Sequence, residues 1–98
     1  MTLLEIQAQI PNSANPIVKV IHKNEHFKVL ALGFKKGVAL KEHKSPLPAK
    51  LTVLEGSVRY KESETTLVLE KFHARDIPVN AIHSVEALED SICLLTQG

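Results

Sequence analysis

The sequence has no tryptophan, and its 98 residues include only three phenylalanines and one tyrosine. Phe27, Phe34, Tyr60 and Phe72 are scattered along the chain, so no stacking platform for single-stranded nucleic acid is expected. An excess of one charge is also lacking, because twelve Lys and Arg oppose eleven Asp and Glu and leave a formal net charge of +1. We therefore expect neither nucleic acid nor an acidic membrane surface as a partner.

Cysteine occurs once, as Cys93, which excludes a disulfide within the chain. This usage fits a reducing compartment, and the first residues lack the basic segment and long apolar stretch of a secretory signal. No apolar run approaches the length needed to cross a bilayer. We therefore expect a cytoplasmic protein, with Cys93 as a core residue inside an apolar run.

A chain of this length predicts one domain, residues 1–98, with a single core. Apolar residues recur mainly with period two and are interrupted by Gly, Pro and polar clusters, which is typical of short antiparallel strands. Residues 1–16 are left open, as an N-terminal arm, a strand or a short helix. Strands are expected near residues 18–20, 27–34, 38–44, 51–54, 57–60, 66–69 and 83–87, and after residue 90.

So many short strands predict an all-β, closed or nearly closed barrel of two sheets, since open edges invite aggregation. The last expected strand, which contains Cys93, has apolar residues on both faces. A second copy of the chain is the economical way to cover its outer face, so we expect a homodimer.

Two spaced patterns carry a resemblance to a known family. Residues 37–56 place Gly37, His43 and Gly56 at the spacing of the first cupin motif, and residues 72–87 keep the Pro78 and His83 of the second. The sequence thus resembles the cupin superfamily, in its small single-domain form. That resemblance implies a double-stranded β-helix, the jelly-roll barrel, but it does not specify a reaction.

The resemblance also implies four metal-ligand positions, which here hold His43, Ser45, Ala49 and His83. Only the two histidines are strong ligands, whereas catalytic zinc sites ordinarily keep three. We expect a weak or absent site for Zn, Fe, Mn or Ni at His43 and His83. Strand alternation predicts that Glu42 points away, so it supplies no third ligand.

The same alternation predicts Lys41, His43 and Ser45 on the inner face, opposite His83. A cation, two imidazoles and a hydroxyl suit a small anion such as a carboxylate. Simpler interpretations compete: the histidines can bond to each other, to Ser45 or to water, Lys41 can be a solvated residue at a strand end, and Ser45 can be a turn residue.

Three functions follow from these residues. The first is a small-molecule-binding protein, weakly catalytic or not an enzyme, that uses the barrel interior with His43 and His83 as its main polar groups. The second is a metal-dependent enzyme, such as an oxygenase or isomerase, with an incomplete shell of protein ligands. The third is a structural or regulatory homodimer with an unused cavity.

Overall fold

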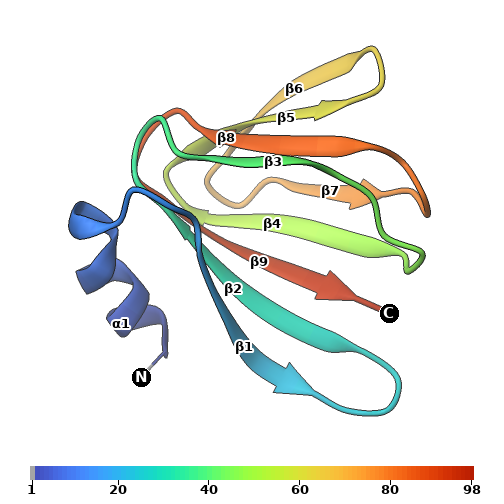
Figure 1. Ribbon diagram of the computed structural model, residues 1–98, viewed down its shortest axis with the longest axis horizontal. Helices are drawn as coiled ribbons and strands as arrows, with labels where there is room; N and C mark the ends of the chain where they lie inside the picture. The colour runs from blue at the N-terminus through green and yellow to red at the C-terminus, as the bar shows by residue number, and fades with distance from the viewer. Residues whose placement is uncertain (1) are drawn as a thin grey trace.

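Residues 2–98, which the computed structural model describes, form nine antiparallel strands in two facing sheets and a helix outside them (Figure 1). The elements are α1 Thr2–Gln9, the 3-10 turn η1 Ile10–Asn12, β1 Ile17–Lys23, β2 Lys28–Phe34, β3 Ala39–His43, β4 Ala49–Glu55, β5 Ser57–Glu62, β6 Thr65–Glu70, β7 Ala74–Ile77, β8 His83–Ala87 and β9 Ser91–Gln97. One sheet has the order β1-β2-β9-β4-β7 and the other β3-β8-β5-β6. This arrangement confirms the predicted all-β jelly roll.

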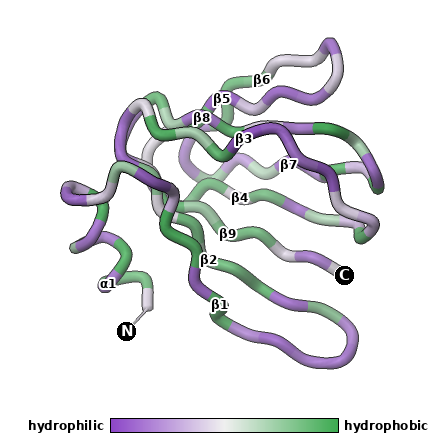
Figure 2. Tube along the Cα trace, in the orientation of Figure 1, coloured by the Kyte–Doolittle hydropathy of each residue, from purple (hydrophilic) through white to green (hydrophobic). Residues whose placement is uncertain are grey.

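The core lies between the two sheets, where alternate residues of each strand turn inward. In β8 the pattern is regular: His83, Val85 and Ala87 are buried, while the residues between them are half-buried. Hydrophobic segments gather along β2 and β9, and hydrophilic ones occupy the tip of the β1–β2 hairpin (Figure 2). Cys93 is fully buried in this core, as predicted, and burial raises the pKa of its thiol to about 12. The other buried members of the core are Leu32, Phe34, Leu51, Val53, Val58, Tyr60, Leu69, Ile77 and Leu95.

Helix α1 covers the outer face of the larger sheet. Its Ile6, together with Ile10 of η1, packs against Ala31 of β2 and Ile92 of β9 in a second apolar cluster. Gly33 makes this approach close, because a Cβ atom there would collide with the Ile6 side chain. Of the alternatives for residues 1–16, the short helix is the one formed; Met1 lies outside the described residues.

The helix also changes the argument for a homodimer. The apolar outer face of β9, which pointed to a second copy, is covered instead by the chain's own N-terminal segment. A homodimer stays a prediction, but that face no longer supports it.

Strand β7 was missed in the sequence. Ala74 and Asp76 are exposed, and the strand pairs with β4 at the edge of the larger sheet. Four residues with two adjacent charges give no strong alternation, so pairing with β4 rather than local propensity defines this strand.

The glycine positions of the two family patterns are turns with left-handed backbone, even where glycine is absent. Gly37 and Gly56 have φ of 86° and 81°, and Phe72 and Asn80 have φ of 71° and 61°. Asn tolerates this region well, whereas Phe seldom adopts it. The Phe72 side chain is 75% exposed. The local geometry of the pattern is therefore kept although two of its glycines are replaced.

No helix in residues 2–98 is long and apolar enough to cross a membrane.

Candidate ligand site at the histidine pair

Two antiparallel neighbours, β3 and β8, bring His43 and His83 directly opposite each other. Their ring centroids lie 4.1 Å apart, with the ring planes inclined at 59°. His83 is 5% exposed, and His43 is half-buried at the end of the edge strand. Residues forty positions apart in the chain therefore form one pair, with the buried ring on β8 and the more accessible ring on β3.

Each imidazole is fixed by its own backbone. Nδ1 of His43 lies 2.8 Å from the carbonyl oxygen of Lys41, and Nδ1 of His83 lies 2.9 Å from that of Ala81. A carbonyl oxygen can only accept, so each Nδ1 carries the proton and donates it. In the neutral ring Nε2 then keeps its lone pair. Both Nε2 atoms can accept a hydrogen bond from a ligand hydroxyl or bind a metal ion.

The environment of His83 favours the neutral ring. Burial lowers its pKa below the ordinary value of 6.5, and the neighbouring charge of His43 lowers it further. The Ala81 carbonyl and the Glu62 carboxylate act in the opposite direction, but burial has the largest effect. At neutral pH the His83 side chain is therefore an uncharged hydrogen-bond acceptor rather than a cation.

A polar network next to the pair was not found in the sequence. Glu62 of β5 lies opposite His83 and accepts a 2.6 Å hydrogen bond from the Tyr60 hydroxyl. Arg75 of β7 reaches both Glu62 oxygens at 3.4 Å and lies over the Tyr60 ring at 5.8 Å. The Tyr60 ring is 6.0 Å from that of His83. Contacts therefore run continuously from His43 through His83 and Tyr60 to a Glu–Arg pair.

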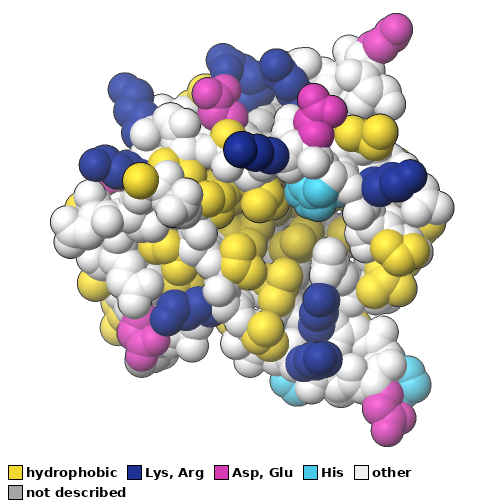
Figure 3. Space-filling view, in the orientation of Figure 1, with side chains coloured by type: hydrophobic (Ala, Val, Ile, Leu, Met, Phe, Trp, Pro, Cys, Tyr) yellow, Lys and Arg dark blue, Asp and Glu magenta, His cyan; other side chains and the backbone are white. Residues whose placement is uncertain are grey.

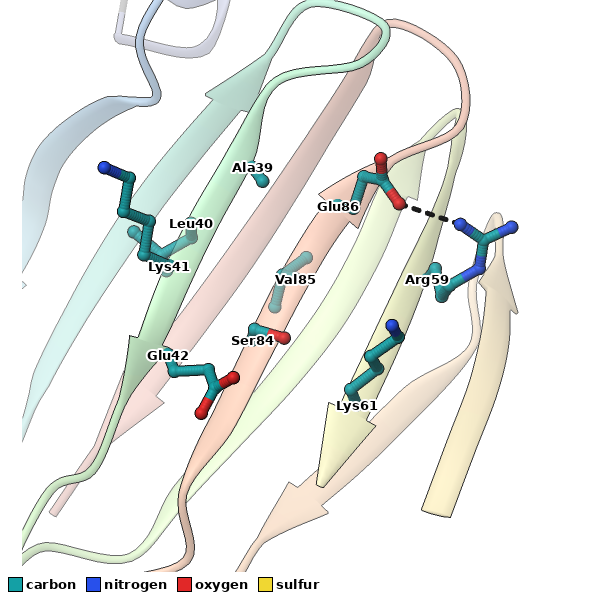
Figure 4. Close-up of a pocket in the computed structure, with 9 residues that line it drawn as sticks. All are labelled: Ala39, Leu40, Lys41, Glu42, Arg59, Lys61, Ser84, Val85 and Glu86. Carbon is teal, nitrogen blue, oxygen red and sulfur yellow. Dashed lines mark hydrogen bonds and ion pairs between the residues drawn. The ribbon is translucent and has the colours of Figure 1, made fainter. Parts of the chain in front are cut away.

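Lys41 does not occupy the inner position that alternation predicted. The pairing of β3 with β8 is regular at Leu40 and Val85 but shifts before His43 and His83, which indicates a bulge. Leu40 packs against the core, and Lys41 is exposed at the edge of the sheet. Figure 4 shows the Lys41 side chain directed away from Val85. The extra residue in β3 interrupts the two-residue period, which is why Lys41 does not lie on the predicted inner face.

Ser45 is placed as a turn residue, the simpler of its two interpretations. Its Oγ accepts a 3.1 Å hydrogen bond from the Leu47 backbone N–H. Its carbonyl accepts a 2.8 Å bond from the Asn80 N–H, which ties the loop after β3 to the turn before β8. Ser45 thus holds together the two loops next to the histidines.

The positions that the resemblance assigns to a metal hold His43, Ser45, Ala49 and His83. Within residues 2–98, no group of three or more His, Cys, Asp or Glu side chains is close enough to hold a metal ion. The chemistry of the pair still fits a weak site, because both Nε2 atoms have free lone pairs. Water or a ligand would have to supply the remaining positions.

The space-filling view shows a hollow at the centre of the face that contains β3 and β2 (Figure 3). Hydrophobic side chains form its floor, a histidine lies at its rim, and Lys or Arg side chains surround it. Leu30, Val38, Leu40 and Ala49 are partly buried apolar residues that pack against the core between the sheets. The arrangement offers an apolar surface with a few directed polar groups, as small-molecule sites commonly do.

Comparison with known proteins finds similarity in structure but not in sequence families. No protein-family model matches the chain, and no curated protein matches it. An RmlC-like cupin from Desulfovibrio desulfuricans superposes with a TM-score of 0.80 at 23% identity, covering 86% of this chain and 82% of that one. An RmlC-like cupin from Shewanella frigidimarina gives a TM-score of 0.81 at 16% identity, covering 88% and 78%. A cupin 2 conserved barrel domain protein from Leptotrichia buccalis gives 0.78 at 28% identity, covering 84% and 40%.

These similarities extend over most of the chain and agree with its two-sheet architecture. The chain is therefore a cupin by fold, with an RmlC-like jelly-roll domain.

Proposed function

We propose that this cupin binds a small hydroxylated molecule in the hollow beside His43 and His83. The observation that carries the proposal is the fixed orientation of the two rings, each of which donates Nδ1–H to a backbone carbonyl. Two Nε2 lone pairs on rings 4.1 Å apart are suited to accept hydrogen bonds from neighbouring hydroxyl groups of one ligand. The apolar floor would bury the carbon face of that ligand.

The charges around the pair favour a neutral ligand over the anion expected from the sequence. Lys41 lies at the exposed edge, and the cation nearest the interior network, Arg75, already pairs with Glu62. These two charges offset each other, and the lowered pKa of His83 keeps that imidazole uncharged at neutral pH. An anion would gain a partner only if Arg75 left Glu62, which would leave a carboxylate that is 14% exposed without its counter-charge.

Glycerol and acetate are suitable probes, because one supplies only hydroxyls and the other only a carboxylate. We expect glycerol to shift the ring-proton NMR signals of His43 and His83 saturably at pH 7.5, and acetate to shift them far less. His43→Gln and His83→Gln should each weaken glycerol binding, whereas His73→Gln, on an exposed turn, should leave it unchanged. Equal effects of the two probes, or a glycerol response that survives both substitutions, would contradict the proposal.

A metal-dependent enzyme is the second candidate, and the free Nε2 atoms favour it as well. In both rings Nε2 is the nitrogen left free, and the Nδ1 contacts are the kind of outer hydrogen bond that orients metal-bound histidine. Zn²⁺ titration of untagged protein by calorimetry tests this. One equivalent bound, and lost in both His43→Gln and His83→Gln, would favour the enzyme. If neither metal nor glycerol binds, a structural or regulatory role with an unused cavity remains.

A further inference from the structure

A groove lies on the outer face of the smaller sheet, and one end of it reaches His83 of the histidine pair. One hollow of about 480 Å³ crosses β3, β8 and β5, and a second of about 320 Å³ adjoins it. Both are lined by Glu42, Ser84 and Lys61, so they form one continuous groove. Its volume is within the range of small-molecule sites.

The groove exists because short side chains lie between long ones. Ser84 of β8, the central strand, is flanked by Glu42 on β3 and by Lys61 on β5, and Lys61 is its direct partner in the sheet. Figure 4 shows the Glu42 carboxylate and the Lys61 side chain on opposite sides of Ser84. Ala39 is the short residue at the other end. The floor is therefore low, and the two walls carry opposite charges.

The charges on the two walls are free to bind a ligand. In the part of the chain that the structure describes, neither Glu42 nor Lys61 makes a side-chain hydrogen bond or an ion pair within 4 Å. Arg59 and Glu86, in the adjacent row, are joined by a 2.8 Å ion pair and offset each other. Beside Ser84 the groove thus offers one carboxylate and one ammonium group. Lys41 also lines the groove and leaves it with one excess positive charge, but its side chain is directed away from Ser84 (Figure 4).

We propose that this groove is a second binding site, for the zwitterion of a free amino acid. The ligand ammonium binds the Glu42 carboxylate, and the ligand carboxylate binds the Lys61 ammonium. The Ser84 hydroxyl donates a hydrogen bond to the same ligand carboxylate. Strands β3 and β5 are two strand spacings apart, about 10 Å. Two hydrogen bonds of about 3 Å and the body of an amino acid between them fill such a gap. The side chain of the ligand would point out of the groove, so the site recognises amino acids as a class.

Glycine tests this directly, because it carries both charges and no side chain. Titration followed by ¹⁵N–¹H NMR should give saturable shifts at the Lys61, Ser84 and Glu86 amides, with a dissociation constant in the millimolar range that rises with salt. Acetate and methylammonium, which each carry one charge, should bind more weakly. Glu42→Gln and Lys61→Gln should each weaken glycine binding about two- to fivefold, the effect of losing one exposed ion pair.

Matched variants at exposed sites outside the groove, Glu25→Gln and Lys35→Gln, should leave glycine binding unchanged. His43→Gln should also leave it unchanged, which separates this site from the one inside the barrel. The inference is overturned if glycine gives no saturable shifts, if acetate alone binds as tightly, or if Glu42→Gln and Lys61→Gln retain full affinity.

Discussion

His43 and His83 face each other with ring centroids 4.1 Å apart, and each ring is held by the carbonyl of the residue two positions earlier. The pair is thus built almost entirely from β3 and β8 themselves. Both free Nε2 atoms result from backbone contacts, so the acceptor character of the site depends little on other side chains.

Burial of His83 makes stability depend on pH. Because its pKa is lowered in the folded state, the unfolded chain binds more protons between that pKa and about 6.5. The free energy of unfolding should therefore fall as pH is lowered below about 6.5, until the folded pKa is reached. Urea denaturation across this window should show the fall in wild type and a smaller one in His83→Gln. An identical pH dependence in both proteins would show that His83 is not the group responsible.

Removal of the Glu62 charge should show whether the contacts of Tyr60 and Arg75 with Glu62 stabilise the fold together. Glu62→Gln weakens the hydrogen bond from Tyr60 and leaves Arg75 without its carboxylate. We expect a loss of about 1.5 to 3 kcal/mol in the free energy of unfolding, the range for hydrogen bonds to charged groups. In an Arg75→Met background the same substitution should cost less, because no cation is left unpaired. An equal loss of free energy in both backgrounds would mean that the 3.4 Å contacts between Arg75 and Glu62 contribute nothing to stability.

Gly33 should be required for the close packing of α1 on the larger sheet. A methyl group there meets Ile6, so Gly33→Ala should lower the free energy of unfolding by about 1 to 3 kcal/mol, as overpacking usually does. Hydrogen exchange of the α1 amides should become faster. In an Ile6→Ala background, Gly33→Ala should lower the free energy of unfolding much less, because the colliding side chain is gone. If α1 exchange is the same in wild type and Gly33→Ala, the helix does not pack as described.

Cys93 should be chemically inert in the folded protein. Burial raises its pKa to about 12, so almost no thiolate exists at pH 8, and reagents cannot reach the side chain. Iodoacetamide labelling followed by mass spectrometry should be slow in native protein and rapid in denaturant. Comparable rates in the two conditions would place Cys93 outside the core.

The strands of the jelly roll could be predicted because inner and outer residues alternate along most of them. The spacing of Gly37, His43, Pro78 and His83 also carried the resemblance without help from the structure. The position of Phe72 shows how robust that spacing is, since the left-handed turn persists with a bulky residue in place of glycine.

The remaining parts of the site could not be predicted from the sequence, because they depend on tertiary contacts. The bulge before His43 reverses the expected place of Lys41, and a bulge leaves no clear mark in a single sequence. Glu62 and Arg75 lie in polar-looking stretches, and only pairing of β5 with β8 and of β7 with β4 brings them to the interior. Helix α1 was left open because its eight residues carry only a weak helical pattern, and Gly33 shows its docking place only in three dimensions.

Two-bond ¹⁵N–¹H correlation spectra of the histidine rings, recorded above pH 7, test the central claim most directly. Both His43 and His83 should show the Nδ1–H form with an unprotonated Nε2, and added glycerol should shift those Nε2 resonances. If both rings instead carry the proton on Nε2, the backbone contacts described above do not hold the pair. The lone pairs on which ligand or metal binding relies would then be absent.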